Sequence, residues 1–171
     1  MIHSLNHSIL RPWSPADMDS LVRYANNFKI SGNMRDGFPY PYTYDHAKAW
    51  IEIATGNLTD IYLAVEIEGK AAGGFGLTHK DDVYRFNAEI GYWLAEEYWN
   101  RGIMSEIIPA MTTWIFQNMP VIRVFAGVFE KNKASMKVLE TSGFVLEAVH
   151  KKAVFKNDLL MDEYIYASYK P

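Results

Sequence analysis

The spacing of apolar and polar positions along this chain predicts a protein of mixed helices and strands. Helical spacing and helix-start residues predict helices over residues 15–26, 43–55, 101–118 and 132–143. Alternating or continuous apolar runs predict strands over residues 8–13, 61–68, 71–78, 83–94, 121–128, 144–149 and 161–169. This order of elements predicts an α+β fold in α/β/α layers, with a mixed central sheet of about seven strands and flanking helices.

Two of the predicted helices have clear start residues. Ser14 is followed by Pro15, which helices accept in the first turn because an N–H group would have no partner there. Thr43 has the same capping role at the start of the second helix. These signals place both helices before any tertiary contact is considered.

Composition indicates one domain in a reducing compartment. The chain has 171 residues, of which 49% are hydrophobic and 15% aromatic, which is enough for one well-buried core and short for two. We therefore expect a single domain over residues 1–171. Because the chain has no cysteine, disulfides, thiolate nucleophiles and cysteine metal sites are excluded, and the cytoplasm is the expected location.

Charge and hydropathy exclude several kinds of partner. A formal net charge of −3 and a pI near 5.9 give no broad basic surface for direct nucleic-acid binding. No apolar run reaches the roughly 18 residues of a membrane span, and the first residues lack a basic region followed by an apolar one, so no membrane association is expected. The histidines, at positions 3, 7, 46, 79 and 150, show no metal-ligand spacing, which predicts no metal site.

The stretch Tyr98–Glu106 is the candidate ligand-binding turn. It joins the strand over 83–94 to the helix over 101–118, within a βαβ unit whose crossover should be right-handed. The first turn of a helix leaves about four N–H groups without partners and adds roughly half a positive charge, so a phosphate or pyrophosphate binds well there. Gly102 either lets such a ligand approach the backbone or only relaxes an ordinary strand-to-helix turn.

Two familiar nucleotide-binding motifs are absent from this turn. The P-loop requires GxxxxGK followed by Ser or Thr, and the dinucleotide fold requires GxGxxG. Between Glu96 and Phe116 the only glycine is Gly102, whereas each of these motifs requires at least two glycines, so neither is present. Nucleotide hydrolysis and hydride transfer therefore lose support.

Three phrases occur in an order typical of one enzyme family. They are AEIGYWL at 88–94, YWxxGI at 98–103 and NxxSxxxLxxxGF at 132–144. Here the chain resembles the GNAT N-acetyltransferases, and more closely their RimJ/RimL-type branch. The resemblance covers nearly the whole chain, because the opening ILRP at 9–12 also looks like the start of that branch. Two residues depart from the general Gln/Arg-x-x-Gly-x-Gly/Ala motif: Trp99 replaces Gln or Arg, and Met104 replaces Gly or Ala.

The resemblance implies a GNAT-like acyl-CoA N-acyltransferase fold that uses acetyl-CoA and releases CoA. The sheet should be splayed between the strands over 83–94 and 121–128, so that strand backbone pairs with the amide-bearing arm of the cofactor. The implied cofactor-binding residues are Tyr92, Trp93 and Leu94 on the strand, Arg101, Gly102, Ile103, Met104 and Ser105 at the pyrophosphate, and Asn132, which also caps a helix. For Arg101 a solvated surface position is the alternative.

Glu89 is the predicted general base. On a strand it shares a face with Gly91 and Trp93, and the missing side chain at Gly91 leaves room for a substrate. It also aligns with a strand glutamate that acts as base in some members of the family. The alternative is a surface carboxylate on a half-exposed strand. Some RimJ/RimL-type enzymes use a later glutamate, but the corresponding Val154 takes no proton, so water relaying for a remote carboxylate is a further possibility.

Ser135 is the predicted proton donor to the departing thiolate. It lies three residues after Asn132, in the first turn of the predicted helix over 132–143. In the enzymes that this chain resembles, the corresponding serine is near the cofactor sulfur, where its hydroxyl acts as a proton relay or hydrogen-bond donor. Simple helix capping is the alternative.

The acceptor should be a primary amine that attacks the thioester directly in a ternary complex. A terminal α-amine, with a pKa near 8, needs a weaker base than a lysine, with a pKa near 10.4. The branch implies a protein or peptide N-terminal amine. The alternatives are a small amine, such as a polyamine, amino acid or antibiotic, and a non-catalytic acetyl-CoA-binding module. Aromatic side chains either line the acceptor groove or pack loops onto the core: Phe38, Tyr40, Tyr42 and Trp50. The oligomeric state is expected to be monomer or homodimer.

Overall fold

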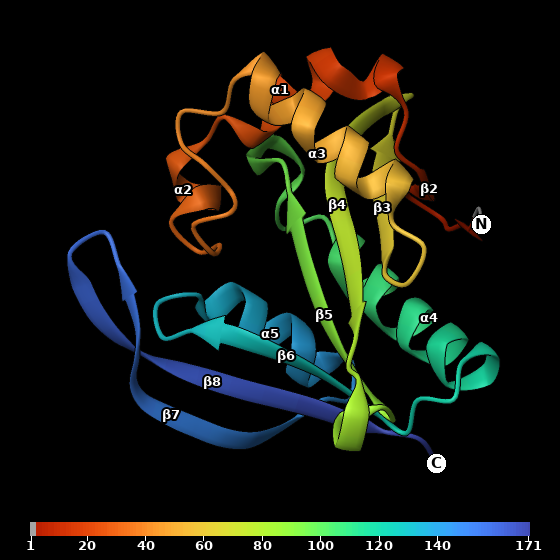
Figure 1. The fold of residues 1–171 in the computed structure, drawn as a ribbon, viewed down its shortest axis with the longest axis vertical. Helices are drawn as coiled ribbons and strands as arrows, with labels where there is room; N and C mark the ends of the chain where they lie inside the picture. The colour runs from red at the N-terminus through yellow and green to blue at the C-terminus, as the bar shows by residue number, and fades with distance from the viewer. Residues whose placement is uncertain (1–2) are drawn as a thin grey trace. The chain divides into compact units, whose positions relative to one another are not determined.

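The computed structural model describes residues 3–171 and contains eight strands. The strands are β1 His3–Ser4, β2 Ile9–Pro12, β3 Ile61–Ile67, β4 Lys70–His79, β5 Asn87–Leu94, β6 Arg123–Phe129, β7 Val145–Lys156 and β8 Leu159–Tyr169. They form one mixed sheet in the order β1-β2-β3-β4-β5-β6-β8-β7 (Figure 1). The predicted α+β fold is confirmed, with eight strands instead of about seven, because the sequence pattern does not reveal the two-residue β1.

The helices agree with the predicted ones except for one short addition. They are α1 Met18–Ala25, α2 Phe28–Ser31, α3 Tyr44–Gly56, α4 Ile103–Asn118 and α5 Lys133–Thr141, with 3-10 turns η1 Pro15–Asp17, η2 Asp82–Tyr84 and η3 Glu96–Tyr98. Thr43 caps α3 as predicted, with its side chain accepting from the His46 N–H. The unpredicted α2 is capped by Asn27, whose side chain accepts from the Lys29 N–H. None of the helices within residues 3–171 has the length and apolar character needed to cross a bilayer.

The chain divides into two compact units. The first unit comprises the residues up to Leu77 together with Tyr92–Ile103, and the second comprises Thr78–Gly91 with Met104–Pro171. In the first unit α1 and α3 pack side by side (Figure 1). Its most deeply buried side chains come from strands and helices alike: Leu10, Leu21, Val65 and Phe75. Each unit thus has its own apolar interior.

A partly buried ionic network connects β2 to η1 and β3 in the first unit. The Arg11 guanidinium donates to both Asp17 oxygens, at 2.8 and 2.7 Å, and also to Glu66 on β3, at 2.5 Å. Asp17 is 5% exposed and accepts a further bond from the Ser14 N–H. Burial alone would raise the pKa of Asp17, but the bonds from Arg11 and Ser14 outweigh it and hold the pKa below its usual value.

Asp17→Asn is expected to lower the free energy of unfolding by about 2 kcal/mol near pH 7, because it removes the charged partner of Arg11. A carboxyl with a lowered folded pKa stabilises the fold above its unfolded pKa of about 3.9, and this contribution is lost as pH falls through the folded value. Urea unfolding should therefore show a smaller difference from wild type near pH 3. Asp81→Asn, at an exposed carboxyl without a capping bond, is the control and should change little; equal effects of the two would contradict the assignment.

The second unit is built on β6, β8 and β7. The strands β7 and β8 run side by side as a long antiparallel hairpin (Figure 1). β7 runs on to Lys156, well beyond the predicted 144–149, and β8 begins at Leu159, two residues before the predicted 161–169. The two strands are joined by a tight turn at Asn157 and Asp158, with φ of 51° and 60°. Conversely, the strand predicted over 83–94 begins only at Asn87, since η2 occupies the residues before it.

The two parallel strands of the predicted βαβ unit pair over a short distance. Asn87–Glu89 of β5 pair with Arg123–Phe125 of β6. Both strands continue past these pairs, to Leu94 and to Phe129 respectively. On its other side β6 pairs with β8 along its whole length, Arg123–Phe129.

Candidate functional site

The turn that leads from β5 into α4 is the first candidate element, and it lies in the first unit. Two of its residues have left-handed backbone, Asn100 with φ of 59° and Gly102 with φ of 76°. Asparagine and glycine are the residues that adopt this conformation at least cost. The predicted helix over 101–118 is present as α4, which begins two residues later than predicted, at Ile103, directly after this left-handed turn.

Trp99 fastens this turn to the end of β5. Its indole Nε1–H donates to the Leu94 carbonyl at 2.7 Å. Tyr98 is 4% exposed, and its ring packs edge-on against Tyr24 of α1, with 6.2 Å between ring centroids. Sequence reasoning noted Trp99 only as a departure from the general motif, whereas the structure shows that it holds the turn in place.

The helix start at Ile103 has the chemistry of an anion site. Its first four N–H groups have no partner within the helix. A Cβ built on Gly102 would meet no atom within 4 Å, so open space lies beside this backbone. Arg101 is exposed, with its guanidinium 5.1 Å from the Tyr98 ring centroid. Met104, the first residue of α4 in the second unit, is 8% exposed, so its side chain is buried.

The end of β5 is held rigid by close backbone packing in the first unit. A Cβ at Gly73 would lie 2.6 Å from the Trp93 carbonyl oxygen, and one at Gly74 would lie 2.6 Å from Trp93 Nε1. Only glycine permits this approach. The backbone of Tyr92–Leu94, predicted to bind the arm of the cofactor, is therefore fixed from the β4 side.

The predicted acceptor-lining aromatics fall into separate groups. Phe38 contacts both Tyr42 and Trp93, at ring-centroid distances of 5.4 and 5.6 Å. Tyr42 is 5% exposed, and burial raises its pKa to about 12. Tyr40, by contrast, is 53% exposed, and its ring packs on Phe28. The structure thus joins Phe38 and Tyr42 to the end of β5 and leaves Tyr40 at the surface.

Trp50 of α3 belongs to a different aromatic cluster. Its ring lies edge-on to Trp13 at 6.4 Å and to Tyr62 at 5.1 Å. Its indole Nε1 and that of Trp13 are buried without a hydrogen-bond partner in the described part of the chain.

Glu89, the predicted base, lies in the second unit and has a cationic neighbour. Lys80 Nζ donates to Glu89 Oε2 at 2.7 Å and also lies 5.5 Å from the Phe125 ring centroid. The Glu89 side chain is 15% exposed. A Cβ at Gly91, two residues along the same strand face, would meet no atom within 4 Å. Open space thus lies beside the backbone at Gly91, on the same strand face as Glu89.

Asn132 and Ser135 lie together at the start of α5. The Asn132 side chain caps the helix by accepting from the Ser135 N–H at 3.2 Å. The predicted capping role of Asn132 is thus confirmed. This bond uses the backbone of Ser135, so it makes no demand on the hydroxyl that is predicted to act as a proton relay.

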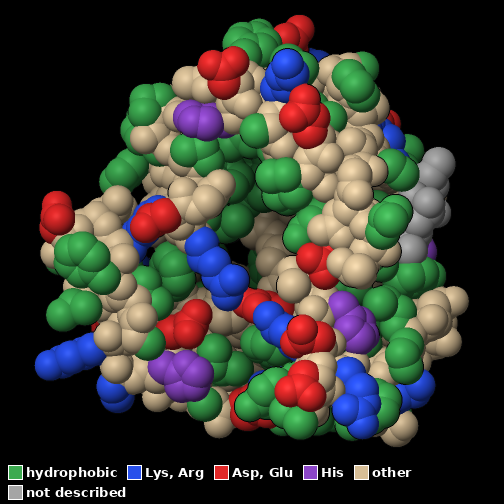
Figure 2. Space-filling view, viewed as in Figure 1, with side chains coloured by type: hydrophobic (Ala, Val, Ile, Leu, Met, Phe, Trp, Pro, Cys, Tyr) green, Lys and Arg blue, Asp and Glu red, His purple; other side chains and the backbone are tan. Residues whose placement is uncertain are grey.

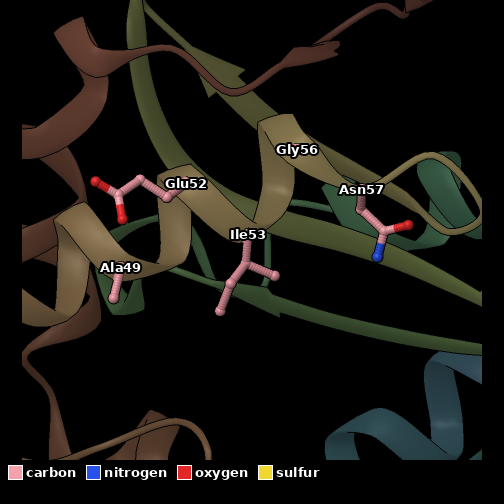
Figure 3. A pocket seen from close by; sticks show the side chains of 5 residues that line it. All are labelled: Ala49, Glu52, Ile53, Gly56 and Asn57. Atoms are coloured by element: carbon pink, nitrogen blue, oxygen red, sulfur yellow. The ribbon is translucent and has the colours of Figure 1, made fainter.

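The surface away from these residues has fewer features that suggest a binding or catalytic site. Figure 2 shows acidic and basic side chains interspersed on one face of the molecule. A shallow hollow of about 520 Å³ lies on the outer side of α3, lined by Ala49, Glu52, Ile53, Gly56 and Asn57 (Figure 3). None of the predicted site residues lines it. Residues 3–171 contain no group of three or more His, Asp or Glu side chains placed to hold a metal ion.

Comparison with known protein families gives a clear match. A family model described as "Acetyltransferase (GNAT) domain" matches residues 7–145. Among curated proteins, the uncharacterized N-acetyltransferase YoaA of Bacillus subtilis is 34% identical over 84 residues, which are 49% of this chain and 48% of YoaA. The ribosomal-protein-serine acetyltransferase of Escherichia coli is 36% identical over 80 residues, 47% of this chain and 45% of that protein. The chain thus matches about half the length of these relatives.

A solved structure of similar fold contains the cofactor product. RimL, described as a ribosomal alpha-N-protein acetyltransferase in complex with coenzyme A, superposes with a TM-score of 0.86 at 21% identity, covering 99% of this chain and 98% of that one. At this identity the likeness establishes the fold alone. The predicted fold family is thereby confirmed.

Proposed function

Because the chain belongs to the GNAT family of acetyltransferases, we propose that it transfers the acetyl group of acetyl-CoA to a primary amine. The observation that carries this proposal is the family match over residues 7–145, which includes the left-handed turn at Gly102 in front of α4. We further propose that residues 1–171 act as one N-acetyltransferase domain.

The cofactor is proposed to bind through main-chain groups. The pyrophosphate would meet the N–H groups at the start of α4, from Arg101 through Ser105, where open space beside Gly102 supports close approach. The amide-bearing arm would pair with the backbone of Tyr92–Leu94 as a peptide adds to a strand. Asn132 would add a side-chain contact to the same arm.

The transfer itself requires one bond to form and one to break. The neutral amine nitrogen attacks the thioester carbonyl carbon, the C–S bond breaks, and the sulfur leaves as a thiolate. Glu89 is proposed to receive the amine proton, directly or through water. Ser135 is proposed to relay a proton to the thiolate, which its place in the first turn of α5 supports.

The acceptor is proposed to be a protein or peptide N-terminal amine. The E. coli relative is named for acetylating a serine of a ribosomal protein, and a terminal amine demands only a weak base. Of the four predicted aromatics, Phe38 and Tyr42, which contact each other near Trp93, are proposed to line the acceptor side. The open space at Gly91 beside Glu89 supports an acceptor approaching along β5.

Acceptor-dependent release of CoA is the test of this function. Purified protein with acetyl-CoA is expected to release CoA with short peptides that have free N-termini, and not with the same peptides blocked at the N-terminus. Release only with polyamines, amino acids or antibiotics would instead identify a small-amine enzyme. Cofactor binding without release on any acceptor would identify a non-catalytic module and contradict the proposal.

A further inference from the structure

Glu163 of β8 lies on the sheet face that α5 leaves uncovered in the second unit. Its neighbour Tyr164 has Lys133 of α5 at 5.2 Å from its ring centroid. Tyr166 donates to Glu140 of α5 at 2.8 Å. Because side chains alternate along a strand, Glu163 points to the opposite face.

The Glu163 carboxylate is short of hydrogen-bond donors. Its nearest charged neighbour is His150, whose Nδ1 lies 3.6 Å from Glu163 Oε2, beyond hydrogen-bond length. Within residues 3–171 no other side chain pairs with it. The Glu163 side chain is 20% exposed, so water reaches only part of it. A carboxylate in this state has lost hydration without full replacement, and it favours a ligand that supplies N–H donors.

The other carboxylates nearby already have cations. The second unit contains the ion pairs Lys80–Glu89, Arg123–Glu147 and Lys151–Asp162. Each of those cations is therefore engaged elsewhere.

Gly127 of β6 makes room for the Glu163 carboxylate. A Cβ at Gly127 would lie 2.6 Å from Glu163 Oε1 and 3.1 Å from Glu163 Cδ. With glycine at this position the carboxylate lies across β6, and a Cβ there would require the end of the Glu163 side chain to shift. The acidic group is thus built into the sheet surface.

Strand register places Glu163 on the same face as Glu89 but away from it. Glu89 pairs with Phe125, and Glu163 pairs with Phe129, four residues along β6. These offsets separate the two backbones by about 13 Å along the strands and about 10 Å across them, or roughly 16 Å in all. One ammonium group does not reach both carboxylates.

We infer that Glu163 binds a second positive charge of the acceptor, a lysine or arginine side chain within the first five residues of the peptide. The inference rests on the proposed function, in which the reacting amine lies next to Glu89. An extended peptide advances about 3.3 Å per residue, so roughly 16 Å corresponds to about five residues. Ammonium and guanidinium groups supply the charge-assisted donors that the carboxylate lacks.

The test compares peptides that differ in one charge. Hexapeptides with arginine, alanine or glutamate at the third, fourth or fifth position are assayed at pH 8 with saturating acetyl-CoA. For wild type we expect kcat/KM for the best arginine peptide to exceed that for its alanine counterpart by about tenfold. In Glu163→Gln and Gly127→Ala the ratio should fall to about one, and Glu163→Arg should favour the glutamate peptide. Glu52→Gln and Gly56→Ala, on exposed parts of α3, should keep the wild-type ratio.

The outcomes of this experiment distinguish failure of the Glu163 subsite from failure of the proposed acetyl transfer. Acetylation of all peptides without charge preference, or a preference that survives Glu163→Gln, overturns the subsite and leaves the transferase intact. Acetylation of no peptide by wild type overturns both. A loss of the preference in the Glu163 and Gly127 variants alone supports the subsite.

Discussion

Glu89→Gln is expected to lower kcat about a hundredfold or more while leaving acetyl-CoA affinity near the wild-type value. Glutamine keeps the size and polarity of the side chain but cannot accept a proton, and general-base catalysis commonly contributes that much rate. Steady-state kinetics over a range of pH measure the effect. The fall in kcat on the acid side, seen when a carboxylate base becomes protonated, should be missing in the variant.

A structural role for Glu89 predicts a different result. The bond from Lys80 to Glu89 would then matter for folding alone, and Lys80→Met would destabilise the protein as much as Glu89→Gln does. Thermal unfolding of both variants provides this control. If Glu89→Gln keeps the wild-type kcat and pH profile, the assignment of Glu89 as base is lost.

Gly102→Val is expected to weaken acetyl-CoA binding by about a hundredfold. The substitution has two effects: it strains a backbone with φ of 76°, and it places a branched side chain in the open space where the pyrophosphate is proposed to bind. Gly69→Val is the matched control, because Gly69 also has φ of 76° and open space around its Cβ position but lies in the turn before β4. Both variants should lose similar stability, and only Gly102→Val should lose affinity. Equal affinity losses would contradict a phosphate site at Gly102.

The candidate ligand-binding turn is predictable from the sequence because its signals are local. A strand-like apolar run, one glycine and a helical apolar spacing follow each other between positions 88 and 118. Thr43 likewise marks the start of α3 through a bond to a residue three positions away. Features that depend on neighbours in sequence are the ones that sequence patterns record well.

The hairpin of β7 and β8 shows where such patterns fail. Opposite His150 and Val154 the strand register shifts, so the alternation of apolar and polar residues is interrupted. The turn itself uses Asn157 and Asp158 in place of the more familiar Asn-Gly or Asp-Gly pair. The sequence pattern therefore ends one strand too early and begins the next too late.

Site contacts between distant segments were equally hidden. The approach of Glu163 to Gly127 depends on the register of β6 with β8, and the Lys80–Glu89 pair depends on the turn that precedes β5. No spacing within one segment encodes either contact. Trp99 is an intermediate case. The sequence shows that it departs from the general motif, but only the structure shows its hydrogen bond to the Leu94 carbonyl.

Calorimetric titration of the purified wild-type protein with acetyl-CoA tests the central claim most directly. We predict saturable one-to-one binding with a dissociation constant below about 100 μM, in keeping with typical Michaelis constants of enzymes. The absence of any binding heat with acetyl-CoA or CoA at millimolar concentration would contradict cofactor binding by the turn at Gly102, and with it the proposed acetyl transfer.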